Sequence, residues 1–255
     1  MSLPTGVEGK TALITGAAGT MGKAATKALL ADGVRVAIAD LSLDSVESVQ
    51  GELVETAFVD RLFPIAFDVS DAVACGTAVR RIESDFGGID ILVNNAGVLS
   101  NNKIADTTPD EWHRVFSINL DGAFYLSKAC LPGMRARKWG RIINVCSFAA
   151  KCGGITAGTA YSVSKSAMIG LTFSLAAETA GMGVTVNGIA PAYVRTPMVT
   201  KQLSEAQRQA VVAQIPVGRY CEPEEFAHVV RFLSSPLAGF ITGEIIDQNG
   251  GLQFD

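Results

Sequence analysis

The chain has 255 residues, of which 48% are hydrophobic and 18% charged, and its formal net charge at pH 7 is −4. A chain of this length buries one sizeable core, and mild acidity without blocks of like charge argues against binding to nucleic acid or an anionic membrane. The sequence holds no apolar run of the ~18 residues that a membrane span needs, and its start lacks the features of a signal peptide. We therefore expect a cytoplasmic protein.

Short apolar runs alternate with helical patterns along the whole chain. Such runs, without polar alternation, are typical of strands buried on both faces of a parallel sheet. We expect strands at Thr11–Thr15, Val34–Ala39, Leu62–Phe67, Ile89–Val93, Arg141–Cys146, Val184–Ile189 and Glu244–Asp247. We expect helices near 20–31, 43–57, 71–86, 110–137 with a break near Asn119, 159–180, 198–213 and 223–234. The alternation predicts an α/β fold in which 1–255 form a single domain, a doubly wound parallel sheet of about seven strands with helices on both faces.

A glycine-rich turn joins the first expected strand to the first expected helix, in the order Gly16, Gly19, Thr20, Met21, Gly22. Glycine at 16 permits a tight turn, and small residues let a pyrophosphate reach backbone N–H groups at the helix N-terminus. A structural turn uses the same residues, but a position directly between a strand and a helix favours a dinucleotide site.

Two acidic residues end the second and third expected strands. Asp40, followed by Leu41, can accept hydrogen bonds from the adenosine ribose hydroxyls, and no Arg or Lys follows within 41–44 to attract a 2′-phosphate. This favours NAD(H) over NADP(H). Asp68 can bind the adenine amine while Val69 packs on the ring. Each aspartate is also consistent with an ordinary helix N-cap.

Tyr161 and Lys165 lie four residues apart on one helix face, so the ammonium can sit beside the phenol. A nearby cation favours the phenolate and lowers the tyrosine pKa toward the range of a general acid or base. Ser147, from a neighbouring strand end, can hydrogen-bond a substrate oxygen. Tyr-x-x-x-Lys also arises by chance, about one time in seven for this composition. The pair therefore indicates a catalytic site only in combination with the expected cofactor site.

Six motifs in order resemble the short-chain dehydrogenase/reductases over essentially the full chain, a family with a single-domain Rossmann-type fold. They are the glycine-rich turn at 15–22, Asn94 to Gly97 after the fourth strand, Asn119, Ser147, the Tyr161/Lys165 pair, and Asn187 to Pro191 after the sixth strand. The family also includes a longer branch of sugar-nucleotide epimerases, whose glycine spacing matches Gly16, Gly19 and Gly22. That branch carries an additional C-terminal domain for which 255 residues leave no room, so we favour the short branch.

The resemblance implies roles for these residues. Tyr161 would donate or accept the proton, Lys165 would lower its pKa and bind the nicotinamide ribose, and Ser147 would hold the substrate oxygen. Asn119 would hold a helix kink that supports a proton relay to Lys165. Further cofactor contacts would come from Asn95, Ala96, Gly97, Pro191, Val194 and Thr196. A homotetramer built from 110–137, 159–180 and the C-terminal segment would also follow.

The expected reaction is reversible hydride transfer between a secondary alcohol and a ketone with NAD. We expect the substrate to be a polyol, sugar, sugar acid or hydroxy acid, and the alternative is a 3-oxoacyl thioester. A non-catalytic NAD-binding sensor or scaffold ranks below both. Lys151 and Arg195 can meet an anionic substrate or be solvated surface cations. Candidate pocket residues are Val98, Leu99, Phe148, Ala149, Ala157 and Tyr193, with a substrate lid over about 193–213.

The five cysteines form no Cys-x-x-Cys pair, and we expect reduced, mostly buried thiols. His113 and His228 fall in charged helical stretches, where surface or packing roles are typical, so we expect no metal site.

Overall fold

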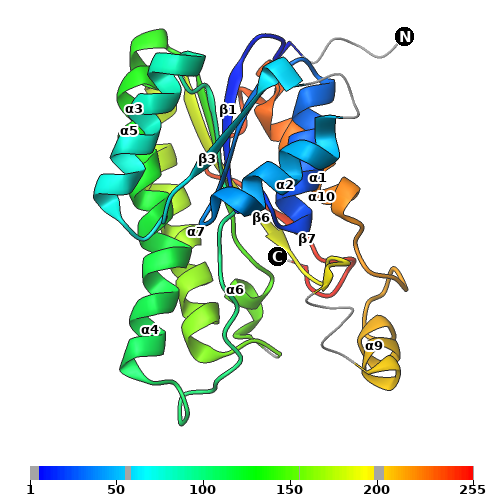
Figure 1. The fold of residues 1–255 in the computed structure, drawn as a ribbon. Helices are drawn as coiled ribbons and strands as arrows, with labels where there is room; N and C mark the ends of the chain where they lie inside the picture. Colours follow the sequence, from blue (N-terminus) through cyan, green and yellow to red (C-terminus); the bar gives the residue numbers. More distant parts are fainter. Residues whose placement is uncertain (1–5, 55–58, 155, 198–203, 255) are drawn as a thin grey trace.

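The computed structural model describes residues 6–54, 59–154, 156–197 and 204–254. Its seven strands form one parallel sheet in the order β3-β2-β1-β4-β5-β6-β7, with helices on both faces (Figure 1). The strands are β1 Thr11–Thr15, β2 Arg35–Asp40, β3 Leu62–Ala66, β4 Ile91–Asn94, β5 Gly140–Val145, β6 Val184–Pro191 and β7 Ile245–Gln248. The predicted doubly wound α/β sheet is confirmed, and each strand lies within about two residues of its predicted bounds at either end.

The helices divide between the two faces of the sheet. They are α1 Thr20–Ala31, α2 Leu43–Val54, α3 Ala72–Phe86, α4 Pro109–Phe116, α5 Gly122–Arg137, α6 Ala149–Cys152, α7 Thr159–Thr179, α9 Glu205–Val212 and α10 Pro223–Ser234. One core cluster joins the sheet to α1, α2 and α10, and the other joins it to α3, α5 and α7. In Figure 1, α4, α6 and α9 lie beyond the carboxyl ends of the strands, where the connecting segments gather.

The strands are buried because their side chains alternate between two apolar layers. Ala12 and Ile14 pack into the cluster with α1 and α10, whereas Leu13 packs into the cluster with α3 and α5. All residues of β1, β5 and β6 are buried. Burial on both faces explains why these segments are apolar without polar alternation in the sequence.

The long helix predicted over 110–137 is broken at the expected place. A π-helical turn, Ser117–Asp121, separates α4 from α5 and contains the fully buried Asn119. π-turns inside α-helices concentrate at functional sites. This turn brings the asparagine side chain against the loop that follows β4.

Two segments differ from their predictions. The short helix α6 was not predicted, because four residues carry no periodicity that can be read from sequence. In the stretch predicted as a helix over 198–213, α9 spans Glu205–Val212, and 198–203 lie outside the described residues.

The remaining expectations concern cysteines, histidines and spans. All five cysteines are free, and Cys75, Cys130 and Cys146 are buried. His113 and His228 are exposed on helices. Among the described residues, no cluster of His, Cys, Asp or Glu is arranged to hold a metal ion, and no helix has the length and hydropathy to cross a membrane.

Candidate active site

A pocket of about 890 Å³ opens at the carboxyl ends of the parallel strands. This is the edge where ligands bind in open α/β sheets. Most of the residues predicted from the sequence line it, namely Gly16, Gly19, Thr20, Met21, Asp40, Leu41, Asp68, Val69, Asn95, Ala96, Gly97, Val98, Leu99, Ser147, Phe148, Ala149, Ala157, Tyr161, Lys165, Pro191, Tyr193, Val194 and Thr196. Gly22, Asn119, Lys151 and Arg195 are outside the lining.

The glycine-rich turn brings its backbone close to the pocket. Gly16 has φ +62°, and a Cβ there would lie 2.9 Å from the Ala96 Cα. A Cβ on Gly22 would collide with the Gly16 carbonyl oxygen. Helix α1 begins after Gly19 with no side-chain cap, so its first N–H groups remain available to a ligand. The turn therefore fits a pyrophosphate at a helix N-terminus.

Asp40 faces the pocket and does not cap a helix. Its Oδ2 accepts a hydrogen bond from the Ala18 N–H at 3.0 Å, and Oδ1 accepts from the Leu41 N–H at 2.8 Å. Helix α2 is capped by Ser42, whose hydroxyl accepts from the Ser45 N–H. The N-cap interpretation of Asp40 is therefore wrong. The carboxylate is held at the rim, where a ribose would lie.

Asp68 is likewise not the helix cap. Helix α3 is capped by Asp71, whose side chain accepts from the N–H groups of Val73 and Ala74. Asp68 accepts from Ser70 N–H and Oγ–H within its own turn, and it lines the pocket beside Val69. The turn thus leaves a carboxylate and an apolar side chain at the edge assigned to adenine.

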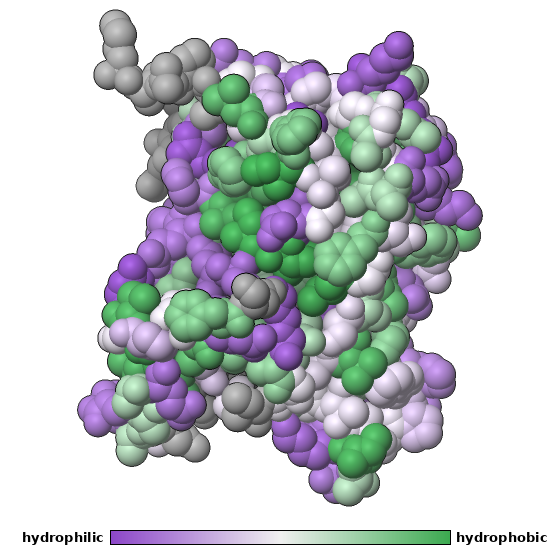
Figure 2. Space-filling model, turned by 180° about the vertical axis from the view of Figure 1, so that it is seen from behind, coloured by the Kyte–Doolittle hydropathy of each residue, from purple (hydrophilic) through white to green (hydrophobic). Residues whose placement is uncertain are grey.

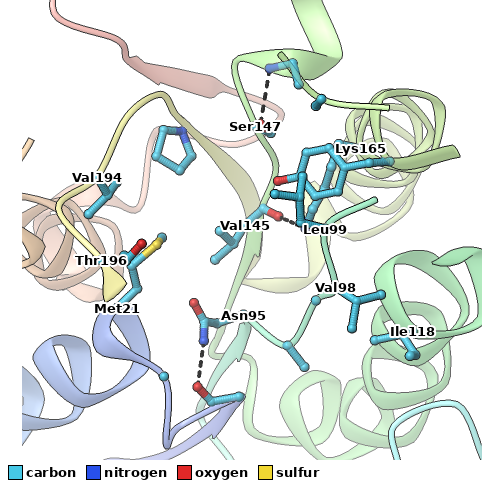
Figure 3. Close-up of a pocket in the computed structure, with 18 of the residues that line it drawn as sticks. Met21, Asn95, Val98, Leu99, Ile118, Val145, Ser147, Lys165, Val194 and Thr196 are labelled. Atoms are coloured by element: carbon cyan, nitrogen blue, oxygen red, sulfur yellow. Dashed lines mark hydrogen bonds between the residues drawn. The ribbon is translucent and has the colours of Figure 1, made fainter. Parts of the chain in front are cut away.

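Asn95 ties the glycine-rich turn to the end of β4. Its amide donates to the carbonyls of Thr15 and Gly16 at 2.9 and 3.1 Å. The Thr15 hydroxyl in turn accepts from the N–H groups of Asn95 and Ala96. These bonds hold two segments that are 80 residues apart in one fixed wall of the pocket (Figure 3).

Asn119 acts from behind this wall. Its side chain exchanges hydrogen bonds with the backbone of Val98, accepting from N–H at 2.8 Å and donating to the carbonyl at 3.0 Å, and it also donates to the Ser164 hydroxyl. A Cβ on Gly97 would lie 3.3 Å from Asn119 Oδ1 and 3.5 Å from Lys165 Nζ. A side chain at 97 would therefore lie in close contact with the asparagine and next to the lysine.

Ser147 and Lys165 lie on one side of the pocket, opposite Met21, Val194 and Thr196 (Figure 3). Tyr161 lines the same pocket and shares a side-chain hydrogen bond with Ser147. Lys165 is buried and donates from Nζ to the Val145 carbonyl at 2.6 Å. Burial lowers the pKa of Lys165 to about 8, so the ammonium still predominates at neutral pH. The Ser147 hydroxyl accepts from the Ala149 N–H at 3.1 Å.

The tyrosine pKa differs from the expectation. Burial raises the pKa of Tyr161 above its ordinary value, and the hydrogen bond with Ser147 only partly opposes this. The lowering by Lys165 that the sequence suggested is not seen, because the ammonium is directed at the Val145 carbonyl. In this structure Tyr161 is a neutral phenol at physiological pH, prepared to donate a proton rather than to accept one.

The two cations considered for an anionic substrate are both paired with carboxylates. Lys151 Nζ lies 2.8 Å from Asp247, and Arg195 Nε lies 2.9 Å from Glu222. The Lys151 side chain is only 15% exposed, so the alternative prediction of a solvated surface cation is also wrong for this residue.

The sequence reasoning missed several lining residues. They are Ala18, Ala39, Phe67, Asn101, Arg114, Ile118, Val145, Cys146, Cys152, Gly154, Thr156 and Ala192, whereas Pro197 and Val211 fall within the predicted lid. Position after a strand end is a usable signal for Val145 and Cys146. Arg114 and Ile118 share a face because they are four residues apart, but the sequence does not say which face turns to the pocket.

A glycine-rich turn on a helix N-terminus, an acidic rim and a Tyr/Lys/Ser cluster together define a dinucleotide-dependent oxidoreductase. A family model described as enoyl-(acyl carrier protein) reductase matches residues 16–253. With this match and the relatives below, the chain belongs to the short-chain dehydrogenase/reductase family. It is an NAD(P)-dependent enzyme acting on CH–OH or keto groups.

Curated relatives match almost end to end. The chain is 40% identical to a 3-oxoacyl-acyl-carrier-protein reductase of Vibrio cholerae, covering 96% of this chain and 98% of that protein. It is 38% identical to an acetoacetyl-CoA reductase of Shinella zoogloeoides, covering 96% and 99%. Because these relatives are of similar length, the chain resembles the short branch of the family and not the longer epimerase branch.

Two solved structures similar to this chain are named as dehydrogenases, not as thioester reductases. A protein from Beutenbergia cavernae described as an NAD(P)-dependent gluconate 5-dehydrogenase, with bound NADP, has a TM-score of 0.91 and 30% identity over 98% of this chain and 99% of its own. A glucose/ribitol dehydrogenase-type protein from Brucella melitensis has a TM-score of 0.86 and 32% identity over 97% and 98%. The fold is therefore shared across proteins whose names point to different substrates.

Proposed function

We propose that this enzyme reduces the keto group of a short 3-oxoacyl thioester, with NADH as the hydride donor. The observation that carries the proposal is the substrate side of the pocket, which is mostly apolar apart from Asn101, Arg114 and Thr156, and near which Lys151 and Arg195 are paired with carboxylates. Its apolar lining includes Leu99, Phe148, Ala157, Tyr193 and Val211. A polyol or sugar acid would leave several hydroxyl or carboxylate groups without partners on such a wall, and unpaired buried polar groups are costly.

Each residue of the cluster has a role in this proposal. A bound reduced nicotinamide supplies the hydride. Ser147 donates a hydrogen bond that orients the substrate oxygen, and Tyr161 gives its phenolic proton to that oxygen. Lys165, still protonated at neutral pH and next to Gly97, would bind the cofactor ribose. Because burial raises the pKa of Tyr161 from an ordinary value that is already well above 7, its phenol is neutral near pH 7, and this is the protonation state that ketone reduction requires.

NAD(H) is the cofactor we propose. Asp40 lies on the pocket rim with its carboxylate fixed by two backbone N–H groups, and Leu41 beside it is 69% exposed. A 2′-phosphate would meet a negative charge there. The protein with bound NADP among the solved structures makes this a point to test.

The first reading of the sequence, oxidation of a sugar acid or polyol, remains the second candidate. It is favoured by Asp40, because NAD often accompanies oxidation, and by the names of the two solved structures. Both proposals keep the chain as one domain and 193–213 as the substrate lid, of which 198–203 lie outside the described residues.

The two candidates are separated by a substrate panel read at 340 nm. Acetoacetyl-CoA is offered with NADH and with NADPH near pH 7, and ribitol, gluconate and 3-hydroxybutyrate are offered with NAD at alkaline pH. We expect NADH-dependent reduction of acetoacetyl-CoA. Turnover of ribitol or gluconate alone would instead establish the dehydrogenase, and a preference for NADPH would overturn the role of Asp40.

We also propose a homotetramer. Figure 2 shows hydrophobic side chains gathered into a band on the side facing away in Figure 1. Exposed aromatic residues include Phe173 on α7, Phe232 on α10 and the fully exposed Phe240. Apolar patches of this kind are covered in an assembly or bind a partner. Native mass spectrometry would show four chains if the proposal holds.

A further inference from the structure

A very short helix follows the candidate catalytic serine. Helix α6 begins two residues after Ser147, and its first N–H, on Ala149, is the donor that the Ser147 hydroxyl accepts at 3.1 Å. The Ala150 N–H also donates to the Ser147 carbonyl. The orientation of the serine side chain is therefore coupled to the placement of α6. A helix of four residues has no stability of its own, so tertiary contacts must hold it.

Lys151 provides such a contact. Its ammonium lies 2.8 Å from Asp247 Oδ2, and the two side chains are only 15% and 18% exposed. Asp247 lies on β7, beside Ala190 of β6. The Phe148 N–H donates to the Pro191 carbonyl at the end of the same β6 strand. The serine turn is thus attached to the sheet edge both through backbone and through this ion pair.

We propose that the Lys151–Asp247 ion pair is a positioning element that holds α6, and with it the Ser147 hydroxyl, in the geometry required for catalysis. The pair does not touch the substrate in this assignment. Phe148 and Cys152, at the two ends of the same turn, line the pocket, so the pair also sets the position of that wall. The inference rests on the proposed role of Ser147.

Chemistry supports a positioning role over an anion-binding role. An ammonium that already has a carboxylate at hydrogen-bond distance, with both groups largely withdrawn from water, loses most of its attraction for a substrate anion. Conversely, removal of either partner leaves a poorly solvated charge next to α6. A displacement of about 1 Å in a catalytic group is enough to cost up to ~100-fold in rate.

The test uses matched variants. Lys151→Met and Asp247→Asn each break the pair from one side, and Lys151→Arg keeps it. Arg231→Met breaks a remote, partly buried pair between α10 and Asp32. We expect Lys151→Met and Asp247→Asn to lower kcat about tenfold with NADH affinity within twofold, and Lys151→Arg to stay near wild type. Arg231→Met should lower only the unfolding temperature.

Hydrogen exchange supplies a readout that needs no substrate. The Ala150 and Cys152 amides should exchange faster in Lys151→Met and not in Arg231→Met. Unchanged exchange and unchanged kcat in Lys151→Met would overturn the inference. An increase in KM for anionic substrates alone, seen in Lys151→Met and not in Asp247→Asn, would show substrate binding by Lys151 instead.

Ser147→Ala separates this inference from the proposed function. If that variant keeps full activity, the role of the serine is wrong, whatever the exchange shows. If it loses activity while Lys151→Met keeps it, the serine role stands and the positioning role fails.

Discussion

The cofactor end and the substrate end of the pocket are built on different principles. At the cofactor end, Gly16, Asp40 and Asn95 lie at the carboxyl ends of the neighbouring strands β1, β2 and β4, and hydrogen bonds to backbone groups fix them. At the substrate end, the wall is assembled from α6, the loop after it, the segment after β6 and α9. There, side chains such as Lys151 and Lys103 reach across to other segments. The comparison teaches that the cofactor end is held by hydrogen bonds to backbone groups at strand ends, whereas the substrate end depends on side-chain contacts between loops and helices.

The largest expected effect lies where the two ends meet. Tyr161→Phe removes the only proposed proton donor, so kcat should fall about 10³-fold, while NADH affinity stays within about twofold because the cofactor end is intact. Steady-state kinetics and NADH fluorescence titration measure the two quantities. Tyr125→Phe, on α5 outside the pocket, is the control. Normal turnover by Tyr161→Phe would sink the mechanism.

Cofactor choice should depend on one charge at the cofactor end. Asp40→Arg replaces a carboxylate on the rim by a cation, and we expect the ratio of kcat/KM for NADH over NADPH to fall about 100-fold. Asp44→Arg makes the same change of charge at an exposed site four residues away and should alter the ratio little. Equal effects of the two substitutions would refute the ribose contact.

The buried lysine should make stability depend on pH. Its native pKa of about 8 lies below its ordinary value of 10.5, so between these pH values the unfolded chain binds more protons than the native protein. Stability therefore rises with pH in this window, and below pH 8 the full cost of a buried charge is present.

Lys165→Met removes this dependence. As the pH rises from 8 to 10.5, the free energy of unfolding of the wild type, measured by urea denaturation, should increase by up to about 3 kcal/mol more than that of Lys165→Met. Lys27→Met, which removes an exposed lysine from α1, controls for the loss of one positive charge. A gap between wild type and Lys165→Met that stays constant with pH would contradict the burial argument.

The smallest effect contrasts two glycines. A Cβ at Gly22 meets the glycine-rich turn, so Gly22→Ala should cost about 1–3 kcal/mol of stability and weaken NADH binding about tenfold or more. Gly51, on the exposed face of α2, has open space around its Cα, and Gly51→Ala should stabilise by about 0.5–1 kcal/mol. Thermal unfolding and NADH titration of the pair test whether the turn is as tightly built as its geometry indicates.

Most of the sheet could be predicted from the sequence, because burial on both faces imposes apolar runs. Most of the candidate cofactor residues could be predicted because they follow the ends of strands. The ion pairs of Lys151 and Arg195 could not be predicted, because their partners Asp247 and Glu222 are far away in the sequence and nothing in it marks them as partners. The sign of the pKa change at Tyr161 was wrong for the same reason. Spacing placed Lys165 beside the phenol, whereas the direction of its ammonium depends on the Val145 carbonyl, which only the packed sheet supplies.

The sequence alone determined the strand–helix alternation, the glycine-rich turn, Asp40 and the Tyr161/Lys165 spacing, since each depends on neighbours within a few residues or on the period of one element. The tertiary structure decided which cations are paired, how deeply Tyr161 and Lys165 are buried, and which wall faces the substrate. Those properties arise from contacts between segments up to 96 residues apart. Desolvation and ion pairing depend on these contacts, so they cannot be inferred from any single segment of the chain.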